Sequence, residues 1–301
     1  MPEGDSLSVL EDLGFESEAS VAVVHVDDVG MCRAANAGAL AAFEGAATCG
    51  SVMVPCSAFE EIAALAREQP ELDLGIHLTL NCEYDDYRWG PVDPAASSLQ
   101  SSDGGMWRSV DETVENGTVE DVEIELRAQI ERAAASGIDI THLDSHMGSI
   151  FHPKFVEVYF KLALEFELPV FIPRVTREVL ERTGMPESLE RYVEIIDGAE
   201  AMGFPIFDAF DNDSLQFEPG QEEAHNVARA DSLGAGLTYL ITHCAVGDAE
   251  LQGITPDWQQ RDGEYQVYSD GRMGAHFERL GVKTIGMRPL RDRLRSLMNR
   301  A

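Results

Sequence analysis

The sequence predicts a single-domain α/β protein that folds as a distorted (β/α) TIM-like barrel. Its 301 residues are about the length of one such barrel, and 44% of them are hydrophobic, which is enough for a sizeable core. About eight short apolar segments alternate with helical sequence, and this alternation implies parallel βαβ units. A doubly wound open sheet and a pair of modest domains are the alternatives that the length leaves open.

Eight segments rich in β-branched and other apolar residues are expected to form the strands. In chain order they are 21–31, 50–55, 74–80, 137–143, 169–173, 204–210, 237–243 and 282–287. The segments between them favour helices through Ala-rich composition, i, i+4 apolar spacing or a serine cap. These helical segments are 33–44, 57–68, 119–135, 153–166, 176–182, 187–202, 220–233, 271–280 and 289–298.

Two stretches fall outside this alternation. Residues 1–19 form an acidic extension that we expect to be solvated, with a short helix around 7–13. Residues 83–118 are rich in Asp, Ser, Gly, Tyr and Trp and are expected to form a long loop. The barrel domain is therefore expected to span 20–301.

The chain is strongly acidic, with 54 Asp and Glu against 22 Lys and Arg and a formal net charge of −32. Such a surface repels phosphate backbones and anionic membranes, so no nucleic-acid or membrane partner is expected. Solubility in high salt or compositional drift explains this charge more simply than a specific cationic partner.

The N-terminus and the cysteines indicate the compartment. Residues 1–20 lack the basic and apolar regions of a secretory signal, and no apolar run reaches a membrane-spanning length. The five cysteines are scattered and contain no C-x-x-C pair, as expected for free thiols in a reducing cytoplasm. We therefore expect a cytoplasmic protein, and a homodimer is compatible with the sequence.

The first strand, V-A-V-V-H-V-D-D-V-G-M, runs into two adjacent carboxylates, Asp27 and Asp28. A buried strand does not gain stability from such an end, because carboxylates are costly to desolvate unless a cation, a donor or water meets them. Gly30 gives the backbone the freedom for a sharp turn. From this stretch alone two interpretations stay open: a cap on the following helix, and a metal or catalytic site.

Polar side chains gather at the other predicted strand ends, where the active site of a barrel lies. His77 ends the third strand, His142, Asp144 and His146 share one face at the end of the fourth, and His243 ends the seventh. Any one of these histidines alone would be read as a core residue. Together with a carboxylate they match the usual ligands of Zn²⁺ and related ions, so we expect a metal site with open positions for water and substrate.

Three motifs resemble, in order and spacing, those of the YdjC-like carbohydrate deacetylases: H-V-D-D-V-G-M, G-I-H-L-T-L and T-H-L-D-S-H. That family includes chitooligosaccharide deacetylases and hopanoid-pathway deacetylase-like proteins. The resemblance covers nearly the whole chain, from about Val21 to Leu290, and the combination of motifs is specific although each alone is weak. It implies a distorted (β/α) barrel and a hydrolase that uses one divalent ion (Zn, Mg, Co or Mn) to deacetylate an N-acetylated sugar or a related amide.

The resemblance also implies roles for single residues. Asp28, His77 and His142 correspond to the metal ligands, and Asp27 to the catalytic base. His243 matches a late histidine of the family and is expected to protonate the leaving amine.

Three further residues are expected to support this site. Arg174, just after the fifth strand, could orient Asp27 or hold its charge, and a surface arginine is nearly as good an interpretation. Asp144 and His146 are expected to fix the orientation of the metal-binding imidazoles.

Aromatic residues in or beside the 83–118 loop are candidates for sugar binding, because sugars use aromatic faces and polar edges. Tyr84 and Trp89 are the leading candidates, with Tyr87 and Trp107 nearby. Packing that orders the loop is an equal alternative for all four.

The chain departs from the family pattern at three places. Val29 stands where Phe is common, Met147 interrupts the histidine cluster, and Cys244 and Ala245 follow the late histidine in place of Pro-Gly. These changes leave the proposed ligands in place and put the substrate in doubt. Two rival functions stay open: a metallohydrolase of another ester, amide or phosphoester, and a catalytically silent sugar-binding protein, which would not need Asp27.

Overall fold

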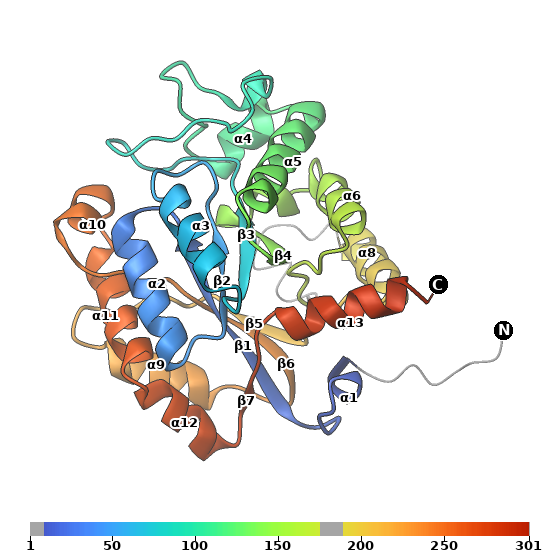
Figure 1. Ribbon diagram of the computed structural model, residues 1–301, viewed down its shortest axis with the longest axis vertical. Helices are drawn as coiled ribbons and strands as arrows, with labels where there is room; N and C mark the ends of the chain where they lie inside the picture. The colour runs from blue at the N-terminus through green and yellow to red at the C-terminus, as the bar shows by residue number, and fades with distance from the viewer. Residues whose placement is uncertain (1–8, 175–188, 301) are drawn as a thin grey trace.

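A computed structural model of the chain describes residues 9–174 and 189–300. A parallel sheet lies at its centre with helices around it (Figure 1). The strand order is β4 (Ile140–Ser145), β3 (Leu74–Leu78), β2 (Cys49–Val52), β1 (Ser20–Val29), β6 (Gly236–Thr242) and β5 (Ala209–Asp211), with β7 (Lys283–Thr284) paired to the first half of β1. The prediction of a single-domain parallel α/β protein is therefore confirmed.

Single bridges connect the two edges of this sheet. Leu143 of β4 pairs in parallel with Val170, and Pro173 pairs with Phe207, two residues before β5. The sheet therefore curls into a ring that is closed by isolated bridges and that β7 does not enter. This geometry is compatible with a distorted barrel and differs from a regular eight-stranded TIM barrel.

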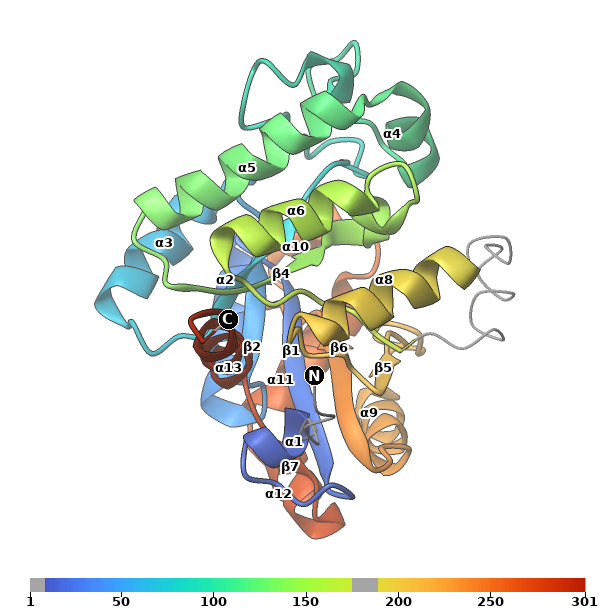
Figure 2. The same cartoon turned by 90° about the vertical axis from the view of Figure 1, so that its right-hand side faces the viewer.

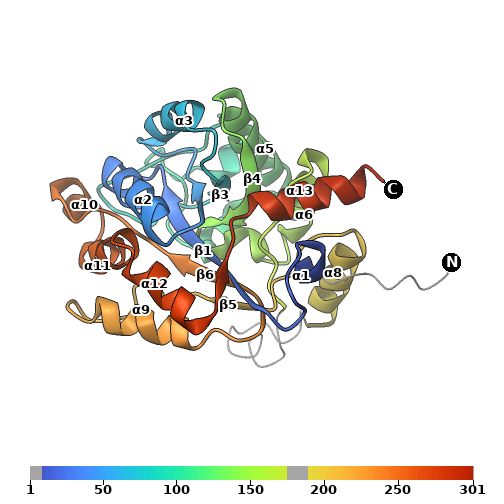
Figure 3. The ribbon, with the colours of Figure 1, turned by 60° about the horizontal axis from the view of Figure 1, so that its bottom comes forward.

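The helices surround the sheet, as Figure 3 shows from its lower end. In chain order they are α1 (Val9–Asp12), α2 (Arg33–Gly45), α3 (Phe59–Glu68), α4 (Val110–Asn116), α5 (Val119–Ala135), α6 (Val156–Phe166), α8 (Leu189–Ala201), α9 (Glu222–Asp231), α10 (Ala249–Ile254), α11 (Trp258–Ser269), α12 (Arg272–Leu280) and α13 (Arg288–Met298), with 3₁₀ turns η1 (Ser97–Leu99) and η2 (His146–Phe151). None of the helices in the described part of the chain is long and apolar enough to cross a membrane.

Three expectations about local structure need correction. The 83–118 stretch contains η1 and α4, and α4 begins with a capping box between Ser109 and Glu112. The stretch 249–269, for which we predicted no element, forms α10 and α11. From Val9 onward the N-terminal extension is packed rather than solvated, because Leu10 is buried and Arg293 of α13 donates to Asp12. The expected helix at 176–182 lies outside the described residues.

The central strand β1 separates two cores. Ala22, Val24 and Val26 face the surrounding helices, whereas Val21 and Val23 face the interior of the ring, where they join side chains of the other strands. Because successive strand residues alternate between faces, the next inward positions after Val23 are 25 and 27. The interior therefore changes from apolar to polar toward the carboxyl end of β1.

The segments that follow the strand ends cover this polar end. In Figure 2, α4, α5 and the loop before them lie above the sheet, and α6 runs below α5. The helix α13 instead packs at the start of β4, where Arg291 donates to the Ile140 carbonyl.

Candidate metal and catalytic site

The two carboxylates at the end of β1 both face one cavity of about 1020 Å³. Neighbouring strand residues normally point to opposite faces. Here the pairing of β1 with β2 shifts register between Val26 and Val29, and Asp28 has φ of 62°, in the left-handed region that non-glycine residues rarely adopt. This bulge lets Asp27 and Asp28 line the same cavity. Neither caps the next helix, because the N-cap of α2 is Cys32.

Asp28 is buried and uses only one of its carboxylate oxygens in an ordinary hydrogen bond. Its Oδ2 accepts from Nη1 of Arg261 at 2.7 Å. Its Oδ1 is a buried oxygen without a hydrogen-bond partner among the described residues. This oxygen lies 3.4 Å from Nε2 of His77 and 3.3 Å from Nδ1 of His146.

These three atoms lie close enough together to hold a divalent ion, within 4.8 Å of one another. Donor atoms about 2.0–2.1 Å from a tetrahedral ion are separated by about 3.3–3.4 Å, which matches the two distances to Asp28 Oδ1. The other ring nitrogens are occupied: Nδ1 of His77 lies 2.8 Å from Asp144, and Nε2 of His146 lies 3.0 Å from Glu83. Carboxylates placed in this way fix the orientation of metal-binding imidazoles. Asp28, His77 and His146 therefore fit a divalent ion.

The charges around the three donors favour a cation. Burial opposes the ionisation of Asp28, but Arg261 and the nearby rings of His146 and His77 outweigh this effect and hold the pKa of Asp28 well below its usual range. Burial also opposes protonation of the two histidines, yet Asp144 and Asp27 raise the pKa of His77 well above its usual value. Glu83 and Asp28 raise that of His146 to about 9. A bound ion would replace these protons.

The structure does not bring His142 into this group. Its Nε2 lies 2.8 Å from Nε2 of His25 and its Nδ1 lies 2.9 Å from Oγ1 of Thr141, so both ring nitrogens are occupied inside the ring of strands. His146, expected only to support the ligands, occupies the position beside Asp28 that we expected for His142. Asp144 has its expected place, since it contacts His77 and also accepts from Ser51.

Asp27 lies beside the three donors without joining them. Its Oδ1 is 2.7 Å from Nδ1 of His25. Its Oδ2 is 3.8 Å from Nε2 of His77 and 3.9 Å from Nε2 of His243, across the same cavity. One oxygen of Asp27 is therefore anchored, and the other is available to a substrate or water.

His243 faces Asp27 from the end of β6 and is supported by buried polar groups. Its Nδ1 lies 2.8 Å from Oγ of Ser214, which in turn donates to Glu264 at 2.8 Å. Glu264 is fully buried and is paired with Arg229 at 3.1 Å. With Nδ1–H directed at Ser214, the Nε2 of His243 is left for the cavity, and the Glu264 carboxylate stabilises the protonated ring.

Arg174 lies away from these groups. Its Nη2 donates to Glu200 at 2.9 Å and its side chain is 46% exposed, which supports the alternative of a surface arginine. The arginine at the site is Arg261 of α11, which also donates to Asp257 at 2.8 Å. Neither Arg261 nor Glu264 was among the predicted site residues, because α11 was not predicted and neither residue follows a strand.

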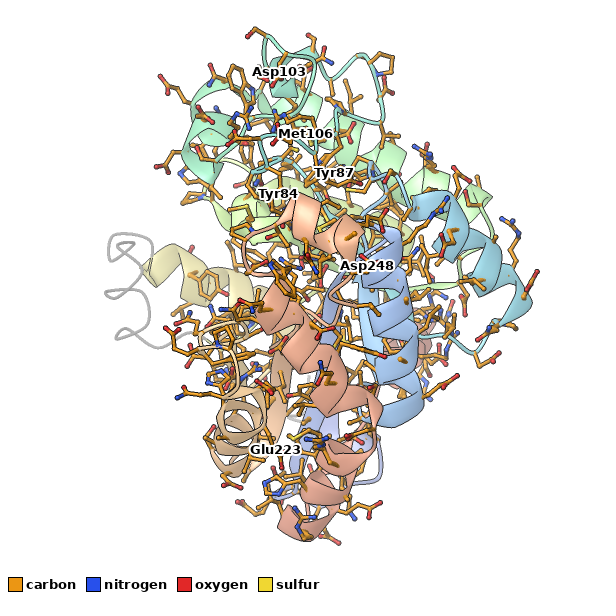
Figure 4. The ribbon with its side chains drawn as sticks, turned by 90° about the vertical axis from the view of Figure 1, so that its left-hand side faces the viewer. Tyr84, Tyr87, Asp103, Met106, Glu223 and Asp248 are labelled. Carbon is orange, nitrogen blue, oxygen red and sulfur yellow. The ribbon has the colours of Figure 1, made fainter. Side chains whose placement is uncertain are left out.

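The aromatic candidates divide between the cavity and the loop. Tyr84 lines the cavity. Trp89 is buried, donates its ring N–H to the Asn81 carbonyl and packs against His146 with ring centroids 6.1 Å apart, so its contacts order the loop. Figure 4 shows Tyr84 and Tyr87 on the inner side of this loop, toward α10, and Asp103 at its outer end. Trp107 also packs within the loop, where it donates to Ser98.

Part of the remaining cavity wall is apolar. This part is lined by Phe151 of η2, Phe171 beside β4, Phe210 of β5 and Ile241 of β6. The cavity therefore combines the charged groups around Asp27 and Asp28 with an aromatic and aliphatic surface, and Asn212 and His152 also line it.

Comparison with known proteins agrees with the three sequence motifs. A family model described as YdjC-like protein matches residues 21–279. A carbohydrate deacetylase of Thermus thermophilus is 34% identical over 87% of this chain and 91% of its own length. One of Geobacillus stearothermophilus is 31% identical over 88% and 96%. A match to a carbohydrate deacetylase of Brevibacillus brevis, at 37% identity, covers half of this chain and 58% of that protein.

The fold also occurs in a solved structure. A proposed cellobiose-phosphate cleavage protein of Enterococcus faecalis V583 superposes with a TM-score of 0.73, covering 90% of this chain and 99% of its own, at 21% identity. At this identity the likeness concerns the fold.

Proposed function

Because the chain belongs to the YdjC-like protein family, we propose that it is a metal-dependent carbohydrate deacetylase that hydrolyses the acetamide of an N-acetylated sugar. The observation that carries the proposal is that His77 Nε2 and His146 Nδ1 lie 3.4 Å and 3.3 Å from the unpartnered Oδ1 of Asp28, beside a free oxygen of Asp27. The names of the full-length relatives support the carbohydrate substrate.

The donors suit certain divalent ions better than others. Two imidazoles and one carboxylate are typical of Zn²⁺, Co²⁺ or Mn²⁺ sites, whereas Mg²⁺ prefers oxygen ligands. A bound ion would polarise the amide carbonyl and acidify the attacking water.

The protein side chains would move the protons. Asp27 Oδ2 takes a proton from the water as its oxygen attacks the carbonyl carbon. His243 donates a proton from Nε2 to the leaving nitrogen as the C–N bond breaks, and Ser214 and Glu264 hold the protonated ring in place. The products are acetate and the free amino sugar. Tyr84, at the cavity wall, is the candidate for contact with the sugar.

Acetate release from a short N-acetylglucosamine oligomer tests this function. We expect no release from protein stripped of metal, and release when Zn²⁺, Co²⁺ or Mn²⁺ is added back. Asp27→Asn should keep the metal and lose turnover. Tight metal binding without acetate release from any N-acetylated sugar would refute the substrate, and failure to bind any divalent ion would refute the site.

A further inference from the structure

Two histidines lie below the proposed catalytic base, inside the ring of strands. His25 of β1 and His142 of β4 are both fully buried. Their Nε2 atoms are 2.8 Å apart, and the remaining nitrogens lie 2.7 Å from Asp27 Oδ1 and 2.9 Å from Thr141 Oγ1. A continuous row of hydrogen bonds therefore runs from Thr141 through both imidazoles to Asp27.

We propose that His25 is a positioning residue for Asp27, and that His142 keeps His25 in the tautomer that donates to it. The inference rests on the proposed role of Asp27 as the base of the deacetylase. Neither histidine touches the cavity, so both act through the Asp27 carboxylate.

The proton positions follow from which atoms can donate. An ionised carboxylate only accepts, so His25 must carry its proton on Nδ1 to bind Asp27. A neutral His25 then has a bare Nε2, which must accept from Nε2–H of His142. The Nδ1 of His142 is left bare and accepts the hydroxyl proton of Thr141. With both rings neutral, this is the one arrangement that satisfies every ring nitrogen. A doubly protonated His25, whose Nε2 lies 3.5 Å from Oδ2 of Asp144, would instead donate to His142.

The charge state of His142 agrees with this arrangement. Burial, together with the neighbouring His25, lowers the pKa of His142 to about 3. The ring is therefore neutral at ordinary pH and has one proton to give. A polar group buried this deeply must make its hydrogen bonds with protein, which explains why the row is complete.

The surrounding residues leave no other place for either ring. A Cβ added to Gly75 of β3 would lie 2.5–2.6 Å from three ring atoms of His142, so only glycine leaves room for that imidazole. On the other side, Tyr239 stacks on His25 with ring centroids 4.8 Å apart and an angle of 28°. The row is thus held by packing as well as by hydrogen bonds.

The contact with His25 determines which oxygen of Asp27 faces the reacting groups. With Oδ1 anchored by His25, the carboxylate of Asp27 cannot rotate freely, and Oδ2 faces His77 and His243 in the cavity. A base whose reactive oxygen is fixed needs no reorganisation when water attacks. Loss of the anchor should therefore reduce kcat and leave metal binding and KM nearly unchanged.

A matched pair of variants separates this role from simple packing. The amide nitrogen of Asn can replace Nδ1 of His25, whereas that of Gln reaches the place of Nε2. We expect His25→Gln to lower kcat about 10–100-fold, and His25→Asn to keep most of it, at equal metal content. Both variants lose ring packing, so a merely structural role would lower the melting temperature and activity of both alike.

Variants of His142 and of its neighbour Gly75 test the second half of the proposal, that His142 keeps His25 in the donating tautomer. His142→Phe and Gly75→Ala should both lower kcat without loss of metal, whereas His276→Gln, on α12 and paired with Asp231, should change nothing. Unchanged kcat in both His25→Gln and His142→Phe would overturn the proposal.

Nitrogen NMR of histidine-labelled, metal-loaded protein provides a readout that is independent of activity. We expect His25 to be protonated at Nδ1 only, with a coupling across the hydrogen bond to Nε2 of His142. A proton on Nε2 of His25, alone or together with one on Nδ1, would overturn the proposal. If the wild-type protein released no acetate but showed this tautomer, the function would fail while the hydrogen-bonded row stood.

Discussion

Replacement of Arg261 by methionine should destabilise the metal-free protein far more than the metal-loaded protein. Arg261 is buried and donates to Asp28 at 2.7 Å and to Asp257 at 2.8 Å. Methionine fills much of the same volume but carries no charge. Asp28 would then be a buried carboxylate that has lost its arginine, with only the rings of His77 and His146 beside it until an ion binds.

The expected loss can be sized from these contacts. Removal of one partner of a buried ion pair costs about 3–5 kcal/mol. With an unfolding entropy of about 2.1 cal/mol/K per residue, 301 residues correspond to about 0.6 kcal/mol per kelvin, so the melting temperature should fall by about 5–8 °C. In the metal-loaded protein the ion replaces the arginine as counter-charge, and the fall should be much smaller. By the thermodynamic cycle, the variant must then bind the ion more tightly, about tenfold for each 1.4 kcal/mol of difference.

The loss of stability caused by Arg261→Met should depend on pH, in a direction that follows from the pKa of Asp28. In the wild-type protein the folded pKa of Asp28 is lowered, so its contribution to stability is present above about pH 4 and disappears as the pH falls through the lowered value. Without Arg261, burial should raise the folded pKa. A raised carboxylate pKa favours the folded state at low pH. The difference in free energy of unfolding between metal-free wild-type protein and metal-free Arg261→Met should therefore become smaller as the pH falls.

Thermal unfolding followed by circular dichroism, with chelator and with added metal, measures this difference. Arg127→Met is the control, because Arg127 pairs at the surface with Glu165 and such pairs contribute about 1 kcal/mol or less. The role we assign to Arg261 would be refuted if the melting temperature of Arg261→Met fell equally with chelator and with added metal. It would also be refuted if the fall were no larger than that of Arg127→Met.

Three further predictions concern the metal and the proposed acid. His146→Gln should abolish tight metal binding, whereas His142→Gln should retain the metal; elemental analysis after dialysis decides, and the opposite result would restore His142 as a ligand. The pKa of His146 is raised to about 9, so metal affinity should fall at least about tenfold for each pH unit below about 9. Calorimetry in two buffers should detect the protons released on metal binding. An affinity that does not change with pH would contradict this prediction. Ser214→Ala should lower kcat about tenfold at unchanged metal content, and an unaltered kcat would remove Ser214 from the support of His243.

Much of the fold and part of the candidate site could be predicted because strand and helix periodicity is local. The β-branched segments gave most of the strands, although 169–173 forms only isolated bridges and 204–210 overlaps β5 only at its end. The rule that active sites lie at strand ends located Asp27, Asp28, His77 and His243 around one cavity. The closure of the sheet depends instead on bridges between segments far apart in sequence. No local pattern indicates how many strands enter such a ring.

Arg261 shows a different limit of local reasoning. It projects from a helix after the seventh predicted strand, in a stretch with neither strong apolar spacing nor a strand end. Its position is determined by the packing of α11, where the partly polar helix buries Arg261, Gly263 and Glu264. The only signal available in the sequence was the pair of adjacent carboxylates at the end of a buried strand. Such a pair calls for a cation, a donor or water, and a cation can come from any part of the chain.

His146 lies where His142 was predicted, beside Asp28. Periodicity could identify which face of the strand carries these histidines, but not how far along the strand each one lies from the cavity. Residues 142, 144 and 146 share one face, yet each step of two residues along a strand moves about 6–7 Å. Depth is set by register with β3, where His77 pairs with Asp144. His142 is therefore level with Gly75, one step too deep to reach Asp28 beyond the bulge of β1. His146 is one step higher, just before the left-handed turn at Met147, and only from there can an imidazole meet both His77 and Asp28.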